Sequence, residues 1–391
     1  MDNSLQSWQR SAIRNSMARY RRAQEEYYVQ GKPLVELEGG YQAFSLVSPP
    51  LGSPATRRRI RLIVDNMSRS NQAGAPVVAR TPHVITVAVT YNCQCDCAHC
   101  SAVDYQKATL QKGDALSFAE LKSAIGQAVD LGTTCVVLTG GEPLLYEKIY
   151  DLVAAVDPSK SVCTIFTNGE FLFEHTVAKL KEAGIFGVFV SFDHSDPVKH
   201  DENRRRPGLS QKAIRGLELC QKAGILTGIS TYATRDKIQN GELDAMMDMA
   251  RDLKVLEVFL FDVIPTGRLS AQRECILTDD EAVQITDFRK KYASKPEYPR
   301  IIHQTMFASI AYPCVAEGCP AAMVQVHLRA NGDVSPCDFT PYSFGNIRTQ
   351  SLREIWDSMC GNELYADPSA RCRLSRPDFW LKLDEVARQP A

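Results

Sequence analysis

The chain has 391 residues, and its 45 Lys and Arg against 46 Asp and Glu give a formal net charge of −1. Hydrophobic residues make up 44% and charged residues 23%, which is typical of a globular protein and excludes a disordered chain. The balanced charge argues against a nucleic-acid-binding protein. Because the sequence has neither a secretory signal pattern nor an apolar run of about 18 residues, we expect a cytoplasmic protein without a membrane partner.

Residues 1–80 form an extension whose role the sequence does not reveal. It begins with a helix-like basic and aromatic stretch from Trp8 to Tyr28 and continues through a segment rich in Pro and Gly. The run Arg57 to Arg59 then starts a predicted helix, and we expect these arginines to lie on a solvated face.

Residues 81–270 alternate short apolar runs with amphipathic helical ones, the pattern of successive βα units. The predicted strands are 84–90, 135–140, 163–168, 187–193, 225–233 and 258–264, and the predicted helices are 117–132, 174–185, 210–225 and 242–255. Six repeats fall two short of a closed eight-fold barrel. The sequence therefore predicts an α/β fold, a partial, open (β/α)6 barrel of the TIM-like kind.

A different module follows the barrel. Residues 271–300 are expected to be a linker with a helix at 278–293, and residues 301–375 a cysteine-rich hairpin and helix module. Within it, Asn331-Gly332 joins two apolar runs and supplies the positive φ angles of a type I′ hairpin turn. Residues 376–391 are left as a C-terminal tail.

The thirteen cysteines are too few and too unevenly spread for a disulfide scaffold. Cys93, Cys97 and Cys100 follow the first predicted strand with the spacing C-x3-C-x2-C. Three thiolates on a cubane of four irons leave one iron open, whereas a structural cluster or zinc site is normally closed by four ligands. Cys95 could make a fourth ligand or a zinc knuckle, but a tight loop does not easily turn two such close thiols inward, so we treat it as a bystander.

The cysteine loop and the motif LTGGEPLL at 138–145 together resemble the radical S-adenosylmethionine (SAM) superfamily. FTNG at 166–169, VSFDHSD at 190–196 and FDVIPTGRL at 261–269 fall at the ends of the later strands, where the resemblance places further SAM contacts. The resemblance implies an enzyme that binds SAM on a 4Fe-4S cluster held by Cys93, Cys97 and Cys100, which are the catalytic residues.

The same resemblance implies a set of SAM-binding residues. Glu142 would accept from the SAM ammonium, Ser191 and Asp193 would reach the ribose, and His99 would stack on the adenine. Without the resemblance, Ser191 and Asp193 read as a strand end with a cap, and His99 as a loop histidine. The full set is His99, Gly140, Gly141, Glu142, Pro143, Thr167, Asn168, Ser191, Asp193, Val263 and Pro265.

The C-terminal cysteines resemble the auxiliary-cluster modules called SPASM or twitch. The resemblance rests on the spacing of Cys319, Gly332 and Cys337 and on FGNIRTQSLREIW at 344–356. It implies one auxiliary 4Fe-4S cluster on Cys319 and Cys337, with Cys314 and Cys372 completing the ligands. Cys360 is expected to be a small buried apolar residue. A structural zinc site is the alternative for this module.

The chemistry that the resemblance implies is reductive cleavage of SAM to a 5′-deoxyadenosyl radical, followed by hydrogen abstraction from a substrate. A flavodoxin- or ferredoxin-type protein would donate the electron. The expected substrate is a peptide or protein side chain. The alternative is a small molecule or tetrapyrrole that is oxidised, dehydrogenated or decarboxylated, and a non-catalytic iron-sulfur or zinc scaffold is a more distant one.

Overall fold

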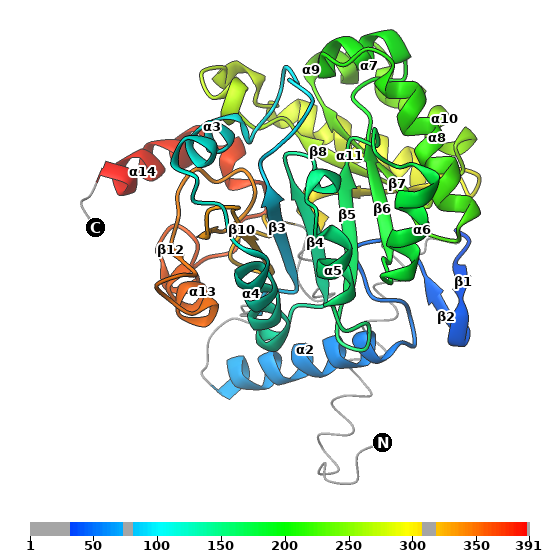
Figure 1. Cartoon of the computed structure of the whole chain (residues 1–391). Coiled ribbons are helices and arrows are strands. Elements are labelled where there is room, and N and C mark those ends of the chain that lie inside the picture. The colour runs from blue at the N-terminus through cyan, green and yellow to red at the C-terminus, as the bar shows by residue number, and fades with distance from the viewer. Residues whose placement is uncertain (1–31, 73–80, 307–317, 389–391) are drawn as a thin grey trace.

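The computed structural model describes residues 32–72, 81–306 and 318–388. At its centre, six parallel strands pair in chain order, and helices cover their outer face (Figure 1). The strands are β3 (Val84–Thr90), β4 (Cys135–Gly140), β5 (Val162–Thr167), β6 (Gly187–Ser191), β7 (Leu226–Ala233) and β8 (Glu257–Asp262). Because β3 and β8 pair with other strands and not with each other, the barrel stays open. The predicted partial barrel is confirmed.

The predicted helices also form, and their apolar faces pack on the sheet. They are α4 (Phe118–Leu131), α6 (Glu174–Glu182), α8 (Leu209–Lys222), α10 (Glu242–Asp252) and α11 (Asp279–Ala293). A capping box fixes the start of α4, where Ser117 and Glu120 exchange hydrogen bonds. The short helices α3 (Val103–Lys112), α5 (Ile149–Ala154), α7 (Pro197–Arg204) and α9 (Arg235–Gln239) were not predicted.

The C-terminal module extends the barrel sheet at its β3 edge. β10 (Gln325–Leu328) pairs in parallel with β3, and β11 (Asp333–Ser335) and β12 (Gly345–Asn346) follow as antiparallel neighbours. At the other edge, β9 (Arg300–His303) pairs with β8. Helix α13 (Leu352–Gly361) packs on the core, and residues of the expected tail form helix α14 (Pro377–Arg388), which buries Phe379 and Trp380.

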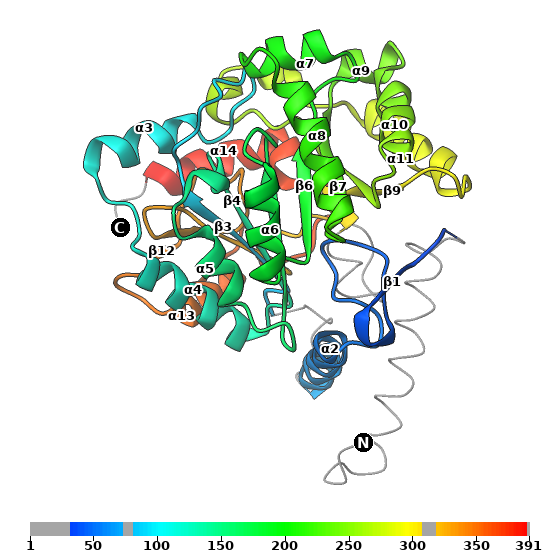
Figure 2. The same cartoon turned by 45° about the vertical axis from the view of Figure 1, so that its right-hand side comes forward.

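The N-terminal extension closes the end of the barrel at which the strands begin. It consists of β1 (Val35–Leu37), β2 (Tyr41–Ala43), a buried segment 43–50 and helix α2 (Pro54–Gln72), which crosses below the strands in Figures 1 and 2. The Leu46 N–H donates to the Glu257 carboxylate at 2.6 Å, and Thr164 Oγ1 donates to the Leu46 carbonyl at 2.7 Å. The stretch from Trp8 to Tyr28 lies outside the described residues.

The arginine run that starts α2 is not a solvated face. Arg59 is only 1% exposed and donates to Ser48 Oγ at 2.9 Å. Arg58 donates to the carbonyls of Thr133 and Val129 at the end of α4, where helix carbonyls lack intrahelical partners. Only Arg57 is exposed. The expectation was wrong for two of the three because these side chains anchor α2 against the barrel.

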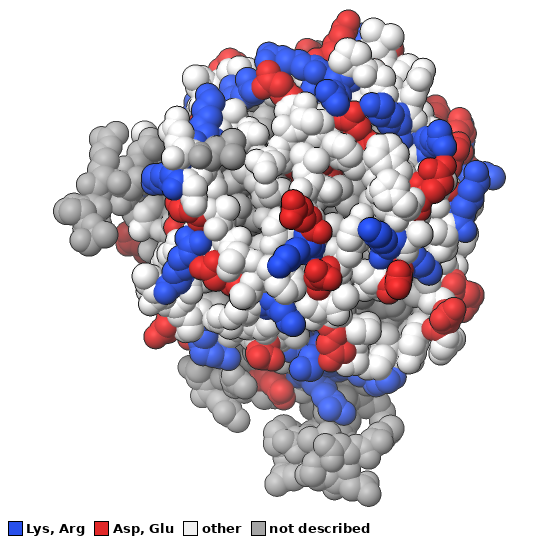
Figure 3. Space-filling model, in the orientation of Figure 1, with Lys and Arg blue, Asp and Glu red and all other residues white. Residues whose placement is uncertain are grey.

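Figure 3 shows basic and acidic side chains interspersed over the face of Figure 1, without a large area of one sign. This mixture agrees with the net charge of −1. No helix in the described part of the chain is both long enough and apolar enough to cross a bilayer.

Candidate active site

A cavity of about 300 Å³ lies inside the barrel and opens where the central strands end. Cys93, Cys97 and Cys100 lie on one wall of this cavity, and Asp338 and Phe339 of the C-terminal module line another. Barrel enzymes place their active sites at this end of the strands. The fold therefore brings both cysteine-rich segments to a single interior space.

The loop that carries Cys93, Cys97 and Cys100 is held by the end of helix α7. The backbone N–H groups of Asp96 and Ala98 donate to the carbonyls of Arg204 and Asn203, at 3.3 and 2.9 Å. Within the loop, the Cys100 N–H donates to the Cys97 carbonyl at 3.2 Å. These bonds give the loop a defined shape, and the three predicted ligands face the same cavity.

Cys95 also turns inward, contrary to expectation. It lines the cavity, and its S–H hydrogen-bonds to the sulfurs of Cys93 and Cys97, which lowers the pKa of both thiols and brings that of Cys97 to about 7. The loop accommodates all four sulfurs because its middle residues pair with α7 rather than with each other. The expectation that Cys95 faces away from the other thiols is therefore wrong.

The residues present fit an iron-sulfur cluster with SAM better than a single ion. In the described ranges, no group of three or more His, Cys, Asp or Glu side chains has the geometry of a single-ion site. A cubane distributes its thiolate ligands over separate irons and does not need that geometry. In addition, Asn168 Nδ2 is buried beside the cavity with no hydrogen-bond partner among these residues, a donor left for a ligand.

Two glycines bring the backbone after β4 against the cysteine loop. The Gly141 N–H donates to the Thr90 carbonyl at 2.8 Å, and a Cβ on Gly141 would lie 2.4 Å from the carbonyl oxygen of Asn92. A Cβ on Gly140, whose φ is +134°, would lie 2.1 Å from the Thr90 oxygen. Only glycine permits this close approach.

We therefore expect Gly141→Ala to push the two loops apart. The predicted result is a loss of about 1–3 kcal/mol in the free energy of unfolding, as for other overpacked sites, and weaker SAM binding. Chemical denaturation and equilibrium dialysis with SAM measure the two effects. Gly126→Ala is the matched control, because a Cβ there meets nothing within 4 Å and the site is helical. Equal stability of the two variants would contradict the steric account.

Glu142 is fully buried and bonds to protein groups. Its carboxylate accepts from Thr167 Oγ1 at 2.7 Å, the Asn168 N–H at 2.9 Å and the Leu144 N–H at 3.0 Å. Burial raises the pKa of Glu142 to about 6. Gly140, Gly141, Thr167 and Asn168 line the cavity, whereas Glu142 and Pro143 do not. The contact between Glu142 and the SAM ammonium stays a prediction.

Asp193 at the end of β6 is paired with an arginine that the sequence analysis missed. Arg204 donates to both carboxylate oxygens, at 2.7 and 2.9 Å. Burial favours the neutral acid, but Arg204 and His99 hold the pKa of Asp193 well below its usual range. Ser191 lies beside it and lines the cavity. In the sequence, Arg204 begins a run of three arginines. Nothing in that run indicates that Arg204 has a different role from the exposed Arg205.

His99 lies over Tyr232 of β7, with ring centroids 4.5 Å apart, and both line the cavity. Burial lowers the pKa of His99 to about 4, so its ring is neutral at pH 7. A neutral imidazole can stack on an adenine, and this contact stays a prediction. At the end of β8, Val263 lines the cavity and Pro265 does not.

The deeper cavity has an aromatic wall that was not predicted. Phe261 lies 4.4 Å from Phe259, 6.2 Å from Phe166 and 5.9 Å from Phe339, measured between ring centroids, and all four line the cavity. Phe259 and Phe261 alternate on β8 and therefore face the same side. In the sequence, the alternation of Phe259 and Phe261 was the one sign of an aromatic wall, but an ordinary core strand shows the same pattern.

Three of the four predicted auxiliary ligands come together. An S–H···S bond from Cys372 lowers the pKa of Cys319 to about 6, and burial raises that of Cys337, which is close to both, to about 12. Cys314 lies outside the described residues. Cys360 is buried and donates to the Ala322 carbonyl at 3.4 Å. Asp338 and Phe339, which line the cavity, directly follow Cys337.

Two family models match the chain. Residues 87–250 match the radical SAM superfamily, and residues 319–374 match the SPASM iron-sulfur cluster-binding domain. An AdoMet-dependent heme synthase of Oleidesulfovibrio alaskensis is 25% identical over 358 residues, covering 83% of this chain and 89% of the relative. A GTP 3′,8-cyclase of Mesorhizobium japonicum is 30% identical over 305 residues, covering 74% of this chain and 87% of the relative.

A solved structure has the same fold. The crystal structure of Streptococcus suis SuiB bound to precursor peptide SuiA has a TM-score of 0.59 and 19% sequence identity, covering 80% of this chain and 70% of SuiB. At this level of identity, the likeness concerns the fold alone.

Proposed function

Since the chain belongs to the radical SAM superfamily and carries a SPASM iron-sulfur domain, we propose that it oxidises side chains of a tetrapyrrole. Its two domains imply 4Fe-4S clusters and SAM as cofactors. A flavodoxin- or ferredoxin-type protein would supply the electron, and the cytoplasm would be the site of action.

When bound, the SAM-ligated cluster supplies a carbon radical that removes a hydrogen atom, and the auxiliary cluster accepts an electron. Cys93, Cys97 and Cys100 would hold the first cluster, and Cys319, Cys337 and Cys372 with Cys314 the second. The glycine pair Gly140 and Gly141 lets the backbone after β4 lie against the cysteine loop that would hold the first cluster. Arg204 keeps Asp193 charged beside Ser191, where a ribose hydroxyl can donate to the free lone pairs.

The aromatic wall between the two cysteine groups is the observation that supports this substrate class. Four phenylalanine rings line the space in which a substrate would lie: Phe166, Phe259, Phe261 and Phe339. Aromatic faces suit a flat, largely apolar macrocycle. The two acidic groups deep in the cavity are each paired with a histidine, Asp262 with His303 at 2.9 Å and Asp338 with His327 at 3.3 Å.

The heme synthase relative directs the proposal towards the tetrapyrrole alternative and away from the peptide first expected from the sequence. Its alignment covers 83% of this chain and 89% of the relative. The likeness to SuiB carries no information on substrate because it concerns the fold. We therefore propose a heme-type biosynthetic step, in which a propionate that loses a hydrogen atom, CO2 and one electron becomes a vinyl group.

The test is anaerobic turnover of the reconstituted protein with SAM, dithionite and iron coproporphyrin, whose longer side chains are all propionates. We expect a porphyrin product that has lost CO2 and two hydrogens from a side chain, detected by mass spectrometry, together with 5′-deoxyadenosine. Deuterium on the propionate should appear in the 5′-deoxyadenosine. Matched reactions with GTP and with a Cys-containing peptide are expected to give no product. Turnover of either one, with iron coproporphyrin untouched, would overturn the substrate assignment.

A further inference from the structure

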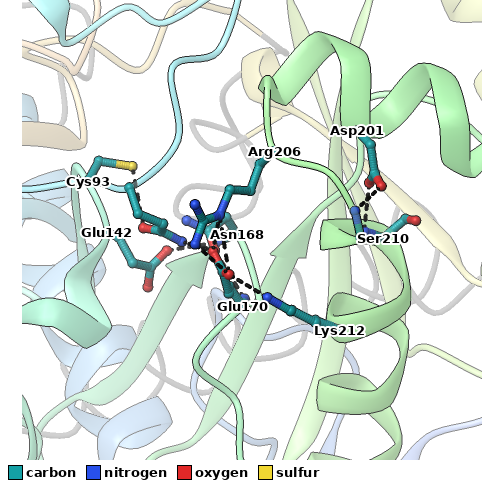
Figure 4. Close-up of polar contacts among 10 residues, drawn as sticks. Cys93, Glu142, Asn168, Glu170, Asp201, Arg206, Ser210 and Lys212 are labelled. Atoms are coloured by element: carbon teal, nitrogen blue, oxygen red, sulfur yellow. Dashed lines mark hydrogen bonds and ion pairs between the residues drawn. The ribbon is translucent and has the colours of Figure 1, made fainter.

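Glu170, three residues beyond β5, is the centre of a polar network beside the cysteine loop (Figure 4). It is only 4% exposed. Its carboxylate accepts from Arg206 at 2.9 Å, from Lys212 at 2.6 Å and from Gln94 at 2.8 Å. Burial alone would raise the pKa of Glu170, but these three hydrogen bonds lower it to about 2. The carboxylate is therefore ionised and fully occupied at neutral pH.

Asp201 fixes the backbone turn that carries the two cations of this network, Arg206 and Lys212. Asp201 accepts from the Ser210 N–H at 2.8 Å and from the Gly208 N–H at 2.5 Å, which fixes the turn between α7 and α8 (Figure 4). Arg206 lies in that turn and Lys212 in the first turn of α8. Both cations are partly exposed, Arg206 at 40% and Lys212 at 49%, but they extend from a backbone turn that Asp201 fixes and meet a carboxylate that is itself buried.

Gln94 connects this network to the cavity. It directly follows Cys93, and its Nε2 donates both to Glu170 and to Asn168 Oδ1, the latter at 3.1 Å. The backbone N–H of Glu170 donates to the same oxygen at 3.0 Å. Two donors on Oδ1 fix which way round the Asn168 amide lies, because the opposite orientation would set N–H groups against N–H groups.

In this fixed orientation, the Asn168 NH2 group points away from Gln94 and from the Glu170 N–H. Asn168 is 4% exposed and lines the cavity, and its Nδ2 is buried without a partner among the described residues. A buried donor that stays unpaired costs free energy unless a ligand accepts from it. The protein thus maintains a donor whose acceptor has to come from what the cavity binds.

We propose that Glu170 is a positioning residue that, through Gln94, holds the Asn168 amide so that its NH2 group donates to an acceptor oxygen of bound SAM. The inference rests on the proposed SAM-dependent function and extends it to residues 94 and 170. Asn168 contacts the cofactor, whereas Gln94 and Glu170 act through it. The carboxylate and hydroxyl oxygens of SAM are the acceptors that such a donor suits.

The test compares SAM affinity in reconstituted holoprotein, measured by equilibrium dialysis and by the EPR change that SAM causes in the reduced cluster. Asn168→Ala is expected to weaken SAM binding about tenfold, and Glu170→Gln or Gln94→Ala by a similar factor, with iron content unchanged. Glu174→Gln is the matched control, because Glu174 also pairs with an arginine of α8, Arg215, at 2.6 Å, but on the surface. It is expected to bind SAM like the wild type.

Double variants distinguish positioning from general stability. In the Asn168→Ala background, Glu170→Gln and Gln94→Ala are expected to weaken SAM binding no further. A full additional loss there, or wild-type affinity in Asn168→Ala, would overturn the inference. If Glu170→Gln fails to fold, Gln94→Ala still decides, because it leaves both ion pairs intact. Wild-type protein that holds iron but does not bind SAM would instead contradict the proposed function.

Discussion

Replacing Cys97 by alanine is expected to abolish SAM cleavage, because two thiolates do not hold a cubane that keeps one iron open for SAM. We predict that 5′-deoxyadenosine formation with dithionite and SAM falls by more than about a thousandfold, with loss of the brown absorption of one cluster near about 400 nm. Chromatography of the anaerobic reaction and iron analysis measure the two effects. The loop itself should persist, since Asp96 and Ala98 hold it through backbone bonds to α7.

Cys220→Ala is the matched control for this experiment. Cys220 is buried in α8, so the same chemical change there removes a core thiol and not a ligand. That variant is expected to keep its iron and its SAM cleavage. If Cys97→Ala cleaves SAM as fast as the wild type, the assignment of this thiolate is wrong, and Cys95, whose sulfur contacts that of Cys97, is the residue to test next.

The second large effect is expected at the auxiliary site. Cys337→Ala should lower the iron content from about eight to about four per chain while SAM cleavage continues, because the first cluster is held by a separate loop. Porphyrin product should disappear, since no acceptor remains for the electron of the oxidised side chain. Iron analysis and mass spectrometry of the product separate these two outcomes.

Cys360→Ala provides the control within the same module. Its thiol is buried and donates to the Ala322 carbonyl, and iron content is expected to stay at the wild-type level. Unchanged iron in Cys337→Ala would reject this cysteine as a ligand. Product formation by a Cys337→Ala protein that lacks four irons would instead show that the auxiliary cluster is not the electron acceptor.

The strands and main helices of the barrel could be predicted because their patterns are local. Val84–Thr90 is apolar except for Thr86 and Thr90, as is typical of a strand covered on both faces, and Ser117 with Glu120 marks the start of α4. The pairing of β10 with β3 could not be predicted, because residues about 240 apart in the sequence carry no local sign of contact. Residues 377–388 were expected to be a tail although they carry a local signal, since Pro377 stands at the helix start and the buried Phe379, Trp380 and Leu383 recur at helical spacing.

The candidate site also contains residues that the local sequence predicts and residues that it does not. The cysteines and glycines have a spacing that the chemistry dictates, so their positions could be read from the sequence. Arg204, Gln94 and Glu170 act through partners on other elements, and their residue types are as common on surfaces. The Arg204 side chain is 11% exposed and that of its neighbour Arg205 is 53% exposed, a difference in burial that the sequence does not report.

Strand β3 joins the two cysteine groups physically. Its last residues lead into Cys93, while Thr86, near its start, donates to Asp338, the neighbour of Cys337, at 3.0 Å. From Thr86 to Thr90 the strand advances four residues, roughly 13 Å at about 3.3 Å per residue, and Cys93 follows three residues after the strand ends. The spacing of the two cysteine-bearing segments is therefore set by one hydrogen-bonded strand, so the room for a molecule held between them does not depend on domain closure.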